Sequence, residues 1–100
     1  MLTPLPAPDR RRRAYLVPWD VDRADPDHPR VRNAAKEPAD LVRVFVHDET
    51  APPSIEHWGL VLPGEVCELC LCDRDLSRTI VSVAWFRADD GEEYLWRFVL

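Results

Sequence analysis

Three cysteines within six residues are the side chains of this chain best suited to chemistry. Cys67, Cys70 and Cys72 could supply three thiolates to zinc, which prefers four sulfur or imidazole ligands, and His57 or His47 could supply the fourth. Residues 66–72, however, have the pattern of a strand, in which successive side chains point to opposite faces. Cys70 and Cys72 then share a face without Cys67, and no glycine or proline lies between them to form a knuckle. We therefore expect cysteines that pack as small apolar residues and no cofactor; a zinc-stabilised domain is the alternative.

A redox role for the Cys67 and Cys70 pair has less support. Thioredoxin-like cysteines lie at the start of a helix, where the dipole lowers the pKa of the attacking thiol. Here the neighbouring side chains are Glu65, Glu68 and Asp73, whose negative charges are expected to raise the thiol pKa. We therefore expect no reactive thiol in this segment.

A run of carboxylates ahead of His28 has the beginning of a calcium-binding loop. An EF-hand loop also needs glycine at its sixth position and glutamate at its twelfth, where this chain has Asp25 and Val31. The motif therefore fails, and a solvated polar loop is the expected structure. The carboxylates are Asp20, Asp22, Asp25 and Asp27.

Catalytic machinery of a familiar kind is missing from the sequence. No serine lies in a Gly-x-Ser-x-Gly elbow, and three glycines are too few for a phosphate-binding loop. A histidine could act as a general base, but nothing in the spacing joins one to a nucleophile. We therefore expect that the protein is not an enzyme. The candidates considered are Ser54, Ser77, Ser82, His28, His47 and His57.

Charge is distributed unevenly along the chain, which has 100 residues and a formal net charge of −5. Residues 1–46 carry 9 basic and 7 acidic side chains, and residues 47–100 carry 4 basic and 11 acidic ones. An acidic half repels phosphate, so binding to nucleic acid is not expected. The same charge supports a weaker hypothesis, in which the acidic half mimics a nucleic acid toward a basic partner.

Length and composition indicate one soluble domain over residues 1–100, since 46% of the residues are hydrophobic. No secretory signal is visible at the start, and no apolar run reaches the roughly 18 residues that span a bilayer. An odd number of clustered cysteines does not suggest a disulfide framework. We therefore expect a cytoplasmic protein with no membrane contact.

Alternating apolar residues predict most of the secondary structure. Residues 79–88 and 93–100 are two strands joined by Asp89-Asp90-Gly91, a strong hairpin signal because glycine accepts a positive φ. Residues 57–62 and 66–72 are two more, joined by a turn at Pro63-Gly64. Two further strands are expected, at residues 42–47 and 13–19.

These elements predict a mainly β fold, a small antiparallel β-barrel or compact sandwich of five to six strands, with the barrel preferred. Residues 1–10 are expected to be a frayed arm. Residues 20–40 form a long proline-punctuated connection that can hold one short helix, and residues 47–56, with Pro52-Pro53, form an exposed loop.

One predicted strand, residues 79–88, is apolar on both faces. Either residues 20–40 cover its second face, or that face is reserved for a partner. The leading hypothesis is a small intracellular, non-catalytic binding module that acts through a protein partner or by self-association. The residues expected at its interface are the aromatic side chains Trp58, Phe45, Trp85 and Phe86 and the basic side chains Arg11 and Arg12.

Overall fold

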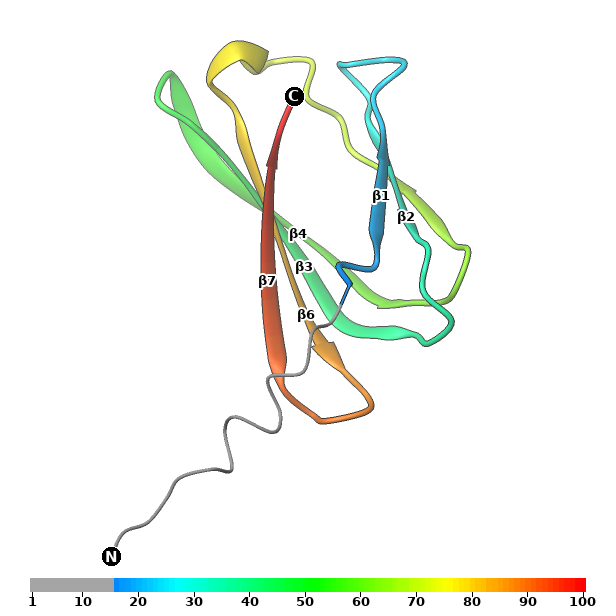
Figure 1. Ribbon diagram of the computed structural model, residues 1–100. Helices are drawn as coiled ribbons and strands as arrows, with labels where there is room; N and C mark the ends of the chain where they lie inside the picture. The colour runs from blue at the N-terminus through cyan, green and yellow to red at the C-terminus, as the bar shows by residue number, and fades with distance from the viewer. Residues whose placement is uncertain (1–15) are drawn as a thin grey trace, which may run out of the picture.

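The chain folds into two antiparallel β-sheets that lie face to face, as the computed structural model of residues 16–100 shows (Figure 1). Sheet A has the strand order β1-β2-β5, and sheet B has the order β4-β3-β6-β7. The strands are β1 (Trp19–Asp22), β2 (Arg30–Asn33), β3 (Ala39–Asp48), β4 (Ala51–Val61), β5 (Val66–Glu68), β6 (Ile80–Arg87) and β7 (Glu93–Val99), with a 3-10 turn η1 (Leu76–Arg78) before β6.

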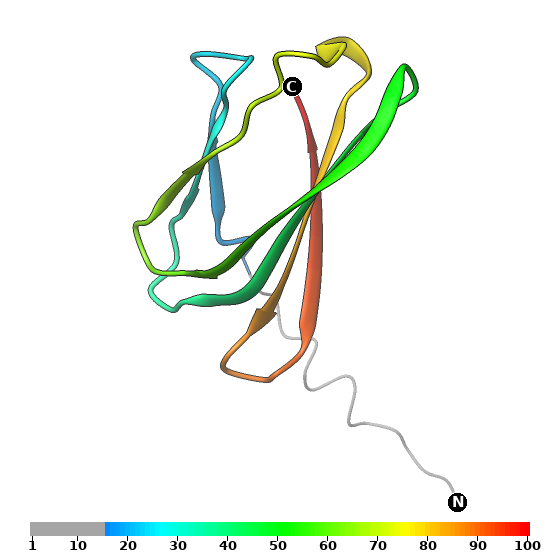
Figure 2. The same ribbon diagram turned by 180° about the vertical axis from the view of Figure 1, so that it is seen from behind.

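The mainly β class and the sandwich form are confirmed, whereas the preference for a barrel is wrong. No strand pairing joins the two sheets among the described residues, so each sheet keeps its edges. Figure 2 shows the two layers from behind, with β1 and β2 on the left, β6 and β7 to their right, and the long strands β3 and β4 running diagonally from the upper right to the lower left.

The core lies between the two sheets and is built mainly from valine. Strand periodicity places every second residue of β3 and β6 inward, where β-branched side chains fill a pleated surface well. Trp85 of β6 forms the centre, in edge contact with Trp19 of β1 (ring centroids 5.6 Å apart) and stacked on Tyr94 of β7 (5.8 Å). The fully buried valines are Val31, Val42, Val44, Val61, Val81 and Val83.

The predicted C-terminal hairpin is confirmed. β6 pairs with β7 in continuous register from Ile80 opposite Val99 to Phe86 opposite Glu93. Gly91 has a φ of 68° in the connecting turn, and its N–H donates to the carbonyl of Arg87 at 2.8 Å. The aromatic face expected on residues 94–100 points into the core.

Two expectations about residues 13–40 are wrong. Residues 20–40 contain no helix among the described residues and instead form the hairpin β1–β2, which covers the inner face of β6. The strand expected at residues 13–19 begins only at Trp19 and runs to Asp22. Residues 16–18 precede this strand, and residues 13–15 and the predicted arm 1–10 lie outside the described residues.

Residues 47–56 belong to the hairpin β3–β4 and not to a loop. Pro52 and Pro53 fit inside β4 because this strand is at the edge of sheet B and because they lie at a register irregularity, between the pairs Val46–Ser54 and Asp48–Ala51. The two prolines also protect that edge from pairing with another chain.

Candidate functional site

The outer face of sheet B, which points away from sheet A, carries six apolar side chains interspersed with polar and charged ones such as Ser82, Arg97 and His57. We use "outer face" below for six side chains on four neighbouring strands: Phe45, Ile55, Ile80, Phe86, Leu95 and Val99. The exposed fractions are 55% for Ile55, 59% for Leu95 and 63% for Val99. No element of residues 16–100 lies over these residues. The predicted strand 79–88, which is apolar on both faces, is β6 in the structure. Its outward face is therefore open, whereas residues 20–40 cover its inward face.

The four aromatic residues expected at an interface divide between the two faces of sheet B. Phe45 and Phe86 belong to the outer face. Trp85 is only 2% exposed and lies at the centre of the core, so its place in an exposed patch is wrong. Trp58 is half-buried against the edge of the core, where its indole N–H donates to Glu56 at 3.2 Å. Side-chain alternation explains the division, because neighbouring strand residues must point to opposite faces.

The two basic residues expected at the interface, Arg11 and Arg12, lie outside the described residues. Among the described arginines, Arg43 lies on the outer face, pairs with Glu93, and has its guanidinium 5.7 Å from the ring centroid of Phe86. The charges at this end of the outer face are therefore satisfied within the chain.

A hollow of about 320 Å³ lies in the middle of the outer face. Its floor is Ala84, which is nearly buried although it points outward, because a methyl group is much shorter than the side chains around it. Arg43 and Leu95 are its direct neighbours on β3 and β7, and Phe45 and Glu93 complete the rim. The hollow is large enough to take one apolar side chain from another molecule.

A second group of functional side chains lies on the outer face of sheet A. The ladder between β2 and β5 continues beyond the formal strands, since the N–H of Leu69 donates to Pro29 (3.0 Å) and that of Leu71 to Asp27 (2.7 Å). In this register His28 stands opposite Cys70, and Cys72 follows on the same face. Two extended segments therefore bring an imidazole and two thiols together.

The three ligand atoms of this group are in contact. His28 Nε2 lies 3.3 Å from Cys72 Sγ, and the Sγ atoms of Cys70 and Cys72 are 3.2 Å apart. All three ligand atoms lie within 4.8 Å of one another. The other ring nitrogen, His28 Nδ1, lies 3.2 Å from a carboxylate oxygen of Asp25 in the tight turn that joins β1 to β2.

The two thiols differ in acidity. The backbone N–H and the thiol of Cys72 bond to Cys70 and lower the pKa of Cys70, while the bond to Cys70 raises the pKa of Cys72 to about 11. The carboxylate of Asp25 raises the pKa of His28. The expectation that acidic neighbours would raise the pKa of Cys70 is wrong, because hydrogen bonds within the cysteine pair outweigh them. For Cys67 the pKa is raised, by burial first and then by Glu65.

Cys67 and His57, expected as ligands beside Cys70 and Cys72, lie apart from them. Cys67 is half-buried on the inner face of sheet A, opposite Val31. His57 is on the outer face of sheet B, opposite Arg43. Strand parity correctly predicted that Cys70 and Cys72 share a face without Cys67. The expectation that all three cysteines pack as apolar residues is wrong, since Cys70 and Cys72 are exposed.

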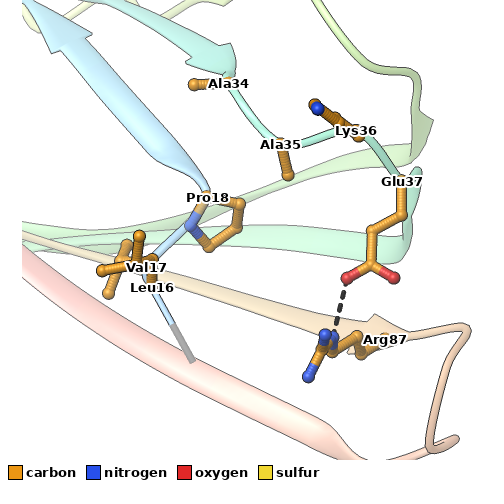
Figure 3. A pocket seen from close by; sticks show the side chains of 8 residues that line it. All are labelled: Leu16, Val17, Pro18, Ala34, Ala35, Lys36, Glu37 and Arg87. Carbon is orange, nitrogen blue, oxygen red and sulfur yellow. Dashed lines mark hydrogen bonds and ion pairs between the residues drawn. The ribbon is translucent and has the colours of Figure 1, made fainter. Parts of the chain in front are cut away.

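A second hollow, of about 570 Å³, opens at the start of β1 (Figure 3). Residues 16–18 and 34–37 line it together with Arg87. The carboxylate of Glu37 accepts a 2.7 Å bond from Arg87 across its rim. Glu37 and Arg87 thus already contact each other, and apart from Lys36 the remaining wall is aliphatic.

Within residues 16–100 no helix is long and apolar enough to cross a membrane. Comparison with known proteins adds no family: no protein-family model, no curated protein and no solved structure matches this chain.

Proposed function

We propose that this protein is a non-catalytic interaction module that self-associates through the outer face of sheet B. The observation that carries the proposal is the open apolar surface of β6 and β7, whose opposite surface forms the core. Leu95 and Val99 are each more than half exposed on this surface. Apolar side chains gathered on one exposed face, here interrupted by Ser82 and Arg97, are typical of an interface.

A second copy of the chain suits this surface because the surface is self-complementary. Leu95 is a protruding apolar side chain, and its direct neighbour Ala84 is the floor of the hollow. A twofold axis along the strands, between β6 and β7, would carry Leu95 of each copy over Ala84 of the other. The same contact would then form twice, as in most twofold symmetric dimers.

The size of the face indicates a weak dimer. The face is four strands wide, at about 4.8 Å per strand, and as long as the seven residues of β7, at about 3.3 Å per residue. These dimensions give a footprint of roughly 440 Å². Stable complexes bury about 800 Å² on each partner. We therefore expect association that depends on protein concentration and that is fully reversible on dilution.

Sedimentation velocity over a range of concentrations tests this proposal, with a chelator and a reductant present so that metal ions and disulfides cannot link the chains. The expected weight-average mass rises from 11.6 kDa toward twice that value. The substitution Leu95→Glu places a charge over the hollow and is expected to keep the protein monomeric. Leu62→Glu is the matched control, because Leu62 is similarly exposed in the turn between β4 and β5.

A mass of 11.6 kDa at every concentration would contradict a second copy as the occupant. Equal loss of the dimer in Leu95→Glu and Leu62→Glu would contradict the outer face as its location.

A further inference from the structure

The group formed by His28, Cys70 and Cys72 is held by backbone pairing and not by flexible side chains alone. Its members project from neighbouring positions of one antiparallel ladder, whose hydrogen bonds at Leu69 and Leu71 fix the two segments on either side of Cys70. Leu69 and Leu71 are buried in the core, so the cysteines between and after them must point outward. The ligand atoms are therefore positioned by the fold.

Exposure of the two cysteines needs an explanation, because free cysteine is among the most commonly buried residue types. Packing accounts for Cys67 but not for Cys70 and Cys72, whose thiols face solvent beside an imidazole. Two thiols and one imidazole are the ligand types that zinc and similar divalent transition metals prefer.

The distances in the group are close to those of a zinc site. Zinc–sulfur bonds of about 2.3 Å and zinc–nitrogen bonds of about 2.0 Å place sulfur atoms about 3.8 Å apart, and sulfur about 3.5 Å from nitrogen, in a tetrahedron. The observed separations are 3.2 Å between Cys70 and Cys72 and 3.3 Å between Cys72 and His28. Small rotations of exposed side chains are sufficient to admit an ion.

A carboxylate already lies behind the imidazole. Asp25 contacts Nδ1 of His28, which leaves Nε2 directed at Cys72. Histidine ligands of metals commonly donate their second ring N–H to such a carboxylate, which fixes the tautomer and the ring orientation. Asp25 is therefore a positioning residue for the ligand His28.

We propose that His28, Cys70 and Cys72 bind one divalent transition-metal ion of the zinc type, with Asp25 orienting the imidazole. Binding displaces the proton of each thiol to solvent as the metal–sulfur bonds form. The described residues supply three ligands, so water completes the tetrahedron. The bound ion joins the β1–β2 turn to the segment after β5, and this cross-link stabilises the rim of sheet A.

Titration of the metal-free, reduced full-length protein with cobalt(II), followed by displacement with zinc(II), tests the site. Cobalt bound by thiolates in a tetrahedron gives a near-ultraviolet sulfur-to-metal charge-transfer band and intense visible bands. We expect one ion per chain. Each of the substitutions Cys70→Ser, Cys72→Ser and His28→Gln should weaken binding more than 100-fold, while Asp25→Asn should weaken it roughly 10- to 100-fold.

The chain offers matched controls for both ligand types. Cys67→Ala removes a thiol three residues from Cys70, and His57→Gln removes an exposed imidazole; both variants should bind cobalt like the parent protein. Thermal melting with a chelator present checks that every variant is folded. Leu95→Glu should also bind cobalt normally, since the site is independent of the outer face of sheet B.

Absence of a charge-transfer band in the reduced parent protein would overturn the proposal. So would an affinity that Cys70→Ser and Cys67→Ala lower equally, because ions would then bind thiols without regard to position. A band that survives in His28→Gln but disappears in His57→Gln would contradict the assignment of the histidine.

Discussion

The turn between β6 and β7 depends on the backbone conformation of Gly91. Its φ of 68° lies in the left-handed region, which costs a residue with a side chain about 1–2 kcal/mol. No atom lies within 4 Å of the position that a Cβ would occupy, so a substitution meets no steric clash with the rest of the protein. The change in stability therefore measures the backbone preference alone.

Three substitutions separate this effect from others. We expect Gly91→Ala to lower the free energy of unfolding by about 1 kcal/mol and Gly91→Val by about 2 kcal/mol, because a β-branched residue resists positive φ more strongly. Gly91→Asn should lose less than either, since asparagine tolerates this region. For a domain of this size, 1 kcal/mol corresponds to about 4–8 °C in Tm.

Urea unfolding followed by tryptophan fluorescence measures these differences at one temperature, and calorimetry gives the Tm values. Equal stability of Gly91→Val and the parent protein would refute the turn conformation. Equal losses in Gly91→Ala and Gly91→Asn would show that the lost stability has a cause other than positive φ.

Two further perturbations test the core and its charged rim. Trp85→Ala should lower the free energy of unfolding by about 3–5 kcal/mol, since Trp85 is buried between Trp19 and Tyr94; a loss below 1 kcal/mol in urea unfolding would contradict its central position. The hydroxyl of Thr50, ahead of Arg74, lowers the pKa of Asp48. Because this carboxyl has a lower pKa in the folded state than in the unfolded state, its ionisation stabilises the fold at pH values above the unfolded-state pKa. This stabilisation is lost as the pH falls through the folded-state pKa. The Tm of the parent protein should therefore fall on acidification more steeply than that of Asp48→Asn, and parallel pH profiles would be the opposite result.

Strong local alternation made the second half of the chain predictable. In β7, Tyr94, Trp96 and Phe98 alternate with polar or exposed residues, and Gly91 marks the turn before them. The pattern and the turn residue are both local, so one sequence is enough to identify the hairpin.

The strands β1 and β2 were missed because their pattern is short and mostly polar. Each has four residues, and the outward positions are charged, as at Asp20, Asp22, Arg30 and Arg32. Only Trp19 and Val21 in β1, and Val31 and buried Asn33 in β2, face inward. Two inward residues are too few for a period to emerge, and the flanking prolines favoured a loop.

The metal-site group was found only in part. Strand parity correctly paired Cys70 with Cys72, but the histidine was sought among residues nearer in sequence. His28 lies 42 residues before Cys70, and only the β2–β5 register brings them together. Strand order depends on tertiary packing, so the sequence alone does not show it. The one local signal was Asp25 three residues before His28, the spacing of a turn that can join a carboxylate to an imidazole.

A dilution series of two-dimensional amide NMR spectra tests self-association through the outer face of sheet B most directly. We predict shifts that change with protein concentration at the amides of Ala84, Leu95 and their neighbours on β3 and β6, while the amides of sheet A remain unchanged. Concentration-dependent shifts confined to sheet A, or spectra identical at all concentrations, would contradict this prediction.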